Sequence, residues 1–449
     1  MNQLSFVEQF AQWFRPAELT RIAWEVRWLV RQGKIEAFEF FVGLVFGQMS
    51  AFRMTLNAQA SCYTQPVKRQ AVDQRYNPAA VELFQRGFKH CLERSLAQTP
   101  APSLTGNLAQ QFDAVHLFDS TSFDLAPSLA AVFPGCGGKA SNANCKVFLR
   151  YEYLRGQFQP LALLPGNRPD QALAAQLPGL LKANELVLID KGFFKTQVLQ
   201  QLDQQKSFFL MPWARSVGLW TVGPASAEPL KLEIAEKLRD AQENRMEWPK
   251  VFLGSPEGLC VRVVAFRLSQ ISAERRRALL RRQAQTKGRQ PTDQALELAG
   301  WLILITNAPV DRLPSPVMAY LYRVRWQIEL IFKQCKSVLR LDSTEARRNP
   351  HRIQCEIWAR LIAAVVLFAW HTHLQSACDR EISFAQVAGQ LRQQGTRLAH
   401  LLIAQGQRLY DDLRLWWRHL LQTTHKGRQR KRKTTWETLQ ENWLNLTAA

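Results

Sequence analysis

The sequence predicts a mixed α/β protein whose sheet is interrupted by a mainly β insertion and flanked by helical regions at both ends. Three observations support this fold class. Apolar residues recur at helical spacing before about residue 105, and short β-branched and aromatic runs alternate with helical segments from 106 to 212. Strands then follow one another up to about 309, and helical patterns resume from about 315.

Composition indicates a partner with many negative charges. The 449 residues include 58 Lys and Arg against 37 Asp and Glu, a net charge of +21. Nucleic acid is the first candidate and an acidic membrane surface the second; the alternative is a protein that is merely basic.

The longest apolar stretches, 38–52 and 361–370, are shorter than the roughly 18 residues of a membrane span, so we expect buried helices and no membrane. The eight cysteines lack zinc-ligand spacing and no signal peptide precedes them, which predicts reduced thiols in the cytoplasm.

Residues 1–105 are predicted to be helical, with a break at Asn77-Pro78. Basic side chains are interspersed around this break. Two interpretations remain open: a DNA-binding region, or a helical cap with solvated basic side chains.

Residues 106–212 are predicted to form the first part of the core. The expected elements are strands at 114–118, 145–154, 157–164, 185–189 and 207–211, and helices at 171–182 and 194–204. The first strand ends at Asp119, and the strand at 185–189 is followed directly by Asp190.

Residues 213–309 are predicted to be the β-rich insertion, with strands at 250–253, 259–268 and 301–306. A basic stretch from Arg275 to Arg289 indicates a solvated arm. Residues 310–375 return to the core, and 376–449 form a C-terminal helical region. Its basic run at 426–433 is either a disordered tail or an arm that contacts DNA.

One helix places four functional side chains on a single face. Tyr322, Arg325, Glu329 and Lys336 lie at about 0°, −60°, −20° and −40° around a helix. A carboxylate can hold a hard metal ion, and neighbouring cations can hold phosphate oxygens. This combination suits chemistry on a nucleic-acid backbone.

Three carboxylates are candidates for a metal site. If the two aspartate-bearing strands are neighbours, Asp119 and Asp190 emerge at one edge of the sheet, where Glu329 can pack beside them. Three carboxylates suffice to hold two Mg²⁺ ions about 3.5–4 Å apart. The alternative for either aspartate alone is a turn or helix-capping residue.

These motifs resemble the DDE transposases of bacterial insertion sequences, of the IS-four type. Their Tyr-x2-Arg-x3-Glu-x6-Lys signature is met by Tyr322, Arg325, Glu329 and Lys336. The resemblance includes the aspartate motifs at 119 and 190 and the stretch 301–307, and it extends over about 106–370.

The resemblance implies an RNase H-like catalytic core and metal-dependent cleavage at transposon ends, followed by strand transfer into target DNA. Asp119, Asp190 and Glu329 would be catalytic metal ligands for Mg²⁺, with Mn²⁺ as a substitute. Tyr322, Arg325 and Lys336 would contact DNA phosphates. The implied partners are double-stranded DNA, at the terminal inverted repeats and the target, and a second copy of the chain in a homodimeric synaptic complex.

Some relatives use an insertion-domain tryptophan to hold a flipped base. The candidates, which are otherwise core residues, are Trp213, Trp220, Trp248 and Trp301. Two alternative functions remain open: an RNase H-like nuclease without strand transfer, and a DNA-binding relative without catalysis.

Overall fold

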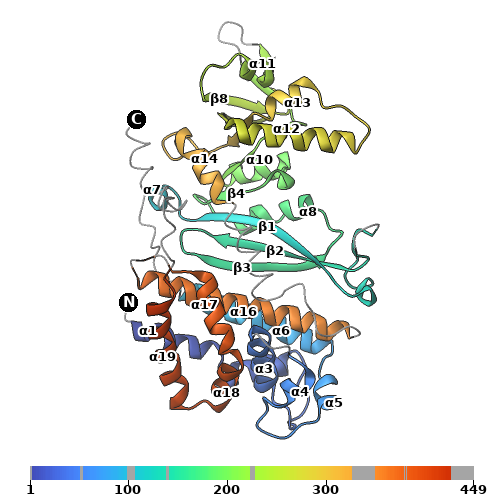
Figure 1. Cartoon of the computed structure of the whole chain (residues 1–449), viewed down its shortest axis with the longest axis vertical. Helices are drawn as coiled ribbons and strands as arrows, with labels where there is room; N and C mark the ends of the chain where they lie inside the picture. The colour runs from blue at the N-terminus through green and yellow to red at the C-terminus, as the bar shows by residue number, and fades with distance from the viewer. Residues whose placement is uncertain are drawn as a thin grey trace. The chain divides into compact units, whose positions relative to one another are not determined.

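The computed structural model describes residues 3–50, 54–98, 107–137, 141–222, 228–325, 349–378, 380 and 382–425 (Figure 1). These residues form two compact units. The first contains the described parts of 1–103, 120–168 and 329–430, and the second contains those of 104–119 and 169–328. Strand β1 (Val115–Asp124) passes from the second unit into the first.

The first unit is mainly helical. Its helices are α1 (Gln3–Trp13), α2 (Pro16–Glu25), α3 (Ala37–Met49), α4 (Leu56–Ala60), α5 (Arg69–Asp73), α6 (Pro78–Ala97), η1 (Pro127–Leu129), α16 (Pro350–Ser376), α17 (Phe384–Gln393), α18 (Gly395–Ala404) and α19 (Gln407–Thr423). The predicted break at Asn77-Pro78 is confirmed. The Asn77 side chain caps α6 by accepting a hydrogen bond from the Ala80 N–H at 2.9 Å, and Pro78 occupies a first-turn position where its missing N–H costs nothing.

Helix α16 is the central helix of this unit. It packs against α3 and α6, and α6 lies alongside it in Figure 1. Its length and composition would allow it to cross a membrane, but 94% of its most apolar window is buried inside the structure, as in a core helix. Every residue of α3 is buried as well. Both apolar stretches therefore lie in core helices over the residues that the structure describes, as the sequence predicts.

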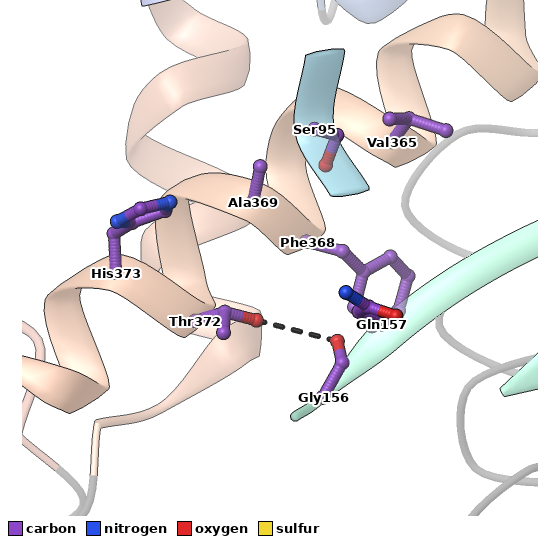
Figure 2. A pocket seen from close by; sticks show the side chains of 8 residues that line it. All are labelled: Ser95, Gly156, Gln157, Val365, Phe368, Ala369, Thr372 and His373. Atoms are coloured by element: carbon purple, nitrogen blue, oxygen red, sulfur yellow. Dashed lines mark hydrogen bonds between the residues drawn. The ribbon is translucent and has the colours of Figure 1, made fainter. Parts of the chain in front are cut away.

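A β-hairpin belongs to the same unit, with strand order β3-β2-β1. Strands β2 (Asn144–Glu152) and β3 (Gln157–Pro165) pair antiparallel, as predicted. Gly156 in the connecting turn has a φ of +68°, which favours glycine. Its carbonyl oxygen accepts a hydrogen bond from Thr372 Oγ1 of α16 at 3.3 Å (Figure 2). The adjoining cavity of about 10 Å³ has room for one water molecule, so we interpret this contact as packing.

The second unit is centred on a sheet with strand order β1-β4-β5-β10-β9-β8-β6-β7. Strands β1, β4 and β5 are parallel, while β10 pairs antiparallel with both β5 and β9. The remaining strands are β4 (Leu186–Leu188), β5 (Phe208–Pro212), β6 (Leu219–Val222), β7 (Pro229–Lys231), β8 (Arg245–Leu253), β9 (Leu259–Arg267) and β10 (Trp301–Thr306). The helices are α7 (Asn107–Gln111), α8 (Asp170–Ala174), α9 (Leu177–Leu180), η2 (Lys191–Phe193), α10 (Thr196–Gln204), α11 (Ile234–Arg239), α12 (Gln270–Gln285), α13 (Asp293–Leu298) and α14 (Ser315–Val324). The predicted mixed α/β class, with an RNase H-like core and an insertion after β5, is confirmed.

Two predicted elements of the core differ from the structure. Strand β1 continues to Asp124, so the prediction that it ends at Asp119 is wrong. Beyond Asp119 the side chains still alternate between the two faces of the strand. Thr121 and Phe123 are buried, while Ser122 and Asp124 are exposed. The single helix predicted at 171–182 is instead the pair α8 and α9, with Pro178 in the first turn of the second helix.

Most residues of the predicted solvated arm are exposed, as expected. Much of it is the helix α12, which lies in the upper part of Figure 1. Two of its arginines contact backbone: Arg276 Nη1 donates to the Trp301 carbonyl oxygen and Arg277 Nε to that of Leu296, each at 3.1 Å. These hydrogen bonds attach one side of the helix to β10 and α13.

Candidate active site

The two aspartates come from neighbouring parallel strands. In the β1–β4 ladder Leu117 lies opposite Leu188, and each aspartate follows its leucine by two residues. This pair is the last of the ladder, and Asp119 and Asp190 each lie two residues beyond it, so the parallel pairing brings both aspartates to the same end of the β1–β4 ladder. The predicted neighbouring strands are thus confirmed, although Asp119 lies within β1 while Asp190 follows the end of β4.

Asp190 is held by its own turn and by a distant helix. Its Oδ1 accepts the Lys191 N–H at 2.8 Å, which caps the short helix η2, and the Tyr322 hydroxyl at 3.4 Å. Its other oxygen, Oδ2, accepts no hydrogen bond from the residues that the structure describes. The carboxylate is half-buried, with one oxygen fixed and the other available to a ligand.

Helix α14 brings the first two signature residues to this site. Tyr322 lies in its last turn and Arg325 immediately follows its end, with the guanidinium carbon 5.7 Å from the tyrosine ring centroid. Burial raises the pKa of the Tyr322 phenol; Arg325 opposes this shift and Asp190 adds to it. The phenol therefore remains protonated at neutral pH and acts as a hydrogen-bond donor. Glu329 and Lys336 lie outside the described residues.

The donor set fits a divalent cation. Two adjacent carboxylates repel each other, and a hard cation such as Mg²⁺ prefers such oxygen ligands. Among the described residues, no group of three or more His, Cys, Asp or Glu side chains could hold a metal ion. A third carboxylate would be supplied by Glu329, as the sequence analysis expects.

Two further arginines near this site could not be recognised from the sequence: Arg276, close to Tyr322, and Arg215, close to Arg276. Arg276 of α12 lies near enough to Tyr322 for the phenol to influence its pKa, and Arg215, which follows β5, lies near Arg276. Both residues are exposed as a whole, but partial burial of the guanidinium groups lowers their pKa, and Arg276 lowers that of Arg215 further. In the sequence, Arg276 stands between two other arginines, and such a run is typical of a solvent-exposed helix face. Only its tertiary contact with Trp301 distinguishes it.

The candidate tryptophans are not equally accessible. Trp301 is 3% exposed, and the Arg267 guanidinium carbon lies 4.5 Å from its ring centroid, so it packs in the core of the insertion. Trp213, Trp220 and Trp248 are half-buried. The indole N–H of Trp213 donates to the Val217 carbonyl oxygen at 2.9 Å.

The family model and the sequence relatives agree with each other. A family model described as "Transposase DDE domain" matches residues 110–366. The chain is 23% identical over 377 residues to the transposase for insertion sequence element IS231F of Bacillus thuringiensis subsp. israelensis, covering 80% of this chain and 78% of that protein. It is 26% identical over 404 residues to the transposase for insertion sequence element IS1151 of Clostridium perfringens, covering 85% and 84%. A solved piggyBac transposase synaptic complex with hairpin DNA aligns with a TM-score of 0.41 at 11% identity, over 95% of this chain and 84% of that one.

Proposed function

Because the chain belongs to the transposase DDE domain family, we propose that it cleaves DNA at the ends of its own insertion sequence and joins them to target DNA. The observation that carries this proposal is the parallel pairing of β1 with β4, which brings Asp119 and Asp190 to the same end of the ladder, with Tyr322 bonded to the second carboxylate. The family match spans this whole arrangement.

We assign the metal ligands to Asp119, Asp190 and Glu329, which would hold two Mg²⁺ ions or Mn²⁺ in their place. When bound, such a pair activates an attacking oxygen and stabilises the leaving oxygen of a phosphodiester. The Lys191 N–H and the Tyr322 hydroxyl both bond Oδ1 of Asp190, which would leave Oδ2 for the metal. Arg325 and Lys336 are the proposed phosphate contacts, because guanidinium and ammonium groups bind phosphate oxygens through charge-assisted hydrogen bonds. The Tyr322 hydroxyl, which the resemblance assigns to a phosphate contact, bonds Asp190 in the structure, so this proposal assigns it to the carboxylate.

Double-stranded DNA is the proposed partner, at the terminal inverted repeats and at the target. The net charge of +21 supports binding through the phosphate backbone. We further propose that a homodimer forms the synaptic complex and that the protein acts in the cytoplasm, associated with the nucleoid.

The test is a Mg²⁺-dependent assay on a labelled duplex that carries the transposon end. Cleavage followed by joining supports the proposed function, cleavage alone indicates a nuclease, and binding without cleavage indicates an inactive relative. Asp119→Asn should abolish cleavage. The matched control is Asp124→Asn, which alters an exposed aspartate of the same strand that bonds Asn144 Nδ2 at 2.9 Å. Equal activity of the two variants would contradict the site assignment.

A further inference from the structure

Among the described residues of the insertion, one arginine is buried. Arg262 lies in strand β9 opposite Thr306, the last residue of β10, and is 6% exposed. Its neighbours Val261 and Val263 are both buried and apolar. A charged side chain at such a position is costly unless it is fully hydrogen-bonded, so its partners indicate why it is there.

The partners of Arg262 lie on the connection between β10 and α14. Nε donates to the Ala308 carbonyl oxygen at 3.1 Å and Nη2 to that of Leu313 at 2.5 Å. Nη1 donates to Ser315 Oγ at 3.3 Å, at the first residue of α14, and pairs with Glu247 Oε1 of β8 at 3.4 Å. The planar, five-donor guanidinium can hold several acceptors at once, which lysine cannot reproduce.

The start of the same connection is fixed separately by Asn307. Its Nδ2 donates to Asp203 Oδ1 and to the Ser207 carbonyl oxygen, each at 2.9 Å, and its Oδ1 accepts the Phe209 N–H at 2.9 Å. Asn307 thus attaches the end of β10 to the core. Arg262 then fixes the remainder, up to the first residue of the helix.

Helix α14 connects the segment held by Arg262 to the candidate active site. Tyr322 follows Ser315 by seven residues on one continuous helix, a rise of about 10 Å. Because the helix is rigid, a displacement of its first turn moves the Tyr322 hydroxyl relative to Asp190. The hydroxyl-to-carboxylate distance of 3.4 Å leaves little room for such a shift.

We propose that Arg262 is a positioning residue, through which the insertion orients α14 and so sets Tyr322 and Arg325 against Asp190. This inference rests on the proposed function. Arg262 touches neither carboxylate and takes no part in the chemistry. Its removal should reduce the cleavage step more than it weakens DNA binding.

The experiment uses the full-length protein with Arg262→Met and Arg262→Lys. The matched control is Arg267→Met, at the last residue of the same strand, where the guanidinium bonds the Ala241 carbonyl oxygen and stacks on Trp301. Arg262→Met should lower the single-turnover cleavage rate by about 10- to 100-fold while the DNA Kd changes by less than about threefold. Arg262→Lys should recover part of the rate, and Arg267→Met should leave it within about threefold of wild type.

A double-mutant cycle tests the route through Tyr322. Adding Tyr322→Phe to Arg262→Met should cost less than the same change costs in wild type, because the hydroxyl is already displaced. Equal costs in the two backgrounds would overturn the proposal. If Arg262→Met does not fold, Arg262→Lys takes its place in the cycle.

Amide hydrogen exchange provides a measurement that does not depend on activity. The positioning variants should exchange faster across 308–322 than wild type, while β8 and the rest of β9 keep their protection. Unchanged protection of 308–322 overturns the proposal whether or not the wild type cleaves DNA. Absence of cleavage by wild type, with the exchange difference present, overturns only the proposed function.

Discussion

Replacing Tyr322 by phenylalanine removes one hydroxyl from the candidate site. The bond that is lost joins Tyr322 Oη to Asp190 Oδ1 at 3.4 Å, longer than most O–H···O hydrogen bonds. Oδ1 keeps the Lys191 N–H at 2.8 Å, so the carboxylate is loosened rather than released. A bond of this kind contributes about 1 kcal/mol, which corresponds to about a fivefold loss in cleavage rate.

The pH dependence of cleavage should not change with this substitution. Burial raises the pKa of Tyr322 above its ordinary value of about 10, so the phenol holds its proton throughout the neutral and mildly alkaline range. The rate–pH profiles of wild type and Tyr322→Phe should therefore run parallel up to about pH 9. A profile that loses an alkaline limb in the variant would show that the phenol titrates during the reaction.

The assay is single-turnover cleavage of an end-labelled duplex in saturating Mg²⁺, with the DNA Kd measured in parallel. Tyr320→Phe is the control, because Tyr320 lies on the same helix and contacts Arg323 rather than Asp190. A loss of about 100-fold or more would refute the positioning role and assign the hydroxyl a direct part in the chemistry. An effect confined to the Kd would instead identify Tyr322 as a phosphate contact.

Three further predictions concern the metal, the charge and the helical unit. Asp119→Asn and Asp190→Asn should each lower cleavage by about 10³-fold or more, and should remove any rise in Tm caused by Mg²⁺; retention of that rise would contradict their assignment as ligands. DNA affinity should fall by about 10³-fold or more between 50 and 200 mM salt, and a flat titration would exclude a backbone-dominated interface. Burial lowers the pKa of His373, which stacks on Phe6 at 3.9 Å, to about 4. The unfolded chain therefore binds this proton more readily, and lowering the pH from 7 to 5 should cost about 2 kcal/mol of unfolding free energy, a loss that His373→Phe should abolish in urea titrations.

Much of the candidate site could be predicted from the sequence because its parts are local. An apolar run followed by an aspartate marks each strand, and a parallel pairing of the two strands then brings Asp119 and Asp190 to the same end of the ladder. The helical spacing of Tyr322 and Arg325 was equally visible. What the sequence could not show is which long-range partner each residue finds, such as the bond from Tyr322 to Asp190.

The contacts of the arginines in α12 and β9 also could not be predicted, because their partners lie far away in the sequence. Helix α12 resembles a solvated arm by composition, yet Arg276 and Arg277 bond to backbone carbonyls from distant segments. Arg262 could have been noticed as the only charged residue between the apolar residues 259 and 266, but its acceptors belong to a connection about 50 residues later. Every residue type has a backbone carbonyl oxygen, so the sequence does not show which carbonyls accept hydrogen bonds from an arginine. Arginines that bind the backbone are therefore difficult to recognise from the sequence.

The pairing of β10 has a practical consequence for protein engineering. This strand is bonded on one side to β5, in the parallel part of the sheet, and on the other to β9 of the insertion. A deletion of 213–300 would expose the unpaired edge of β10 and invite aggregation. Truncated proteins or chimaeras that exchange the insertion between homologues should therefore keep β9 and β10 together as one cassette.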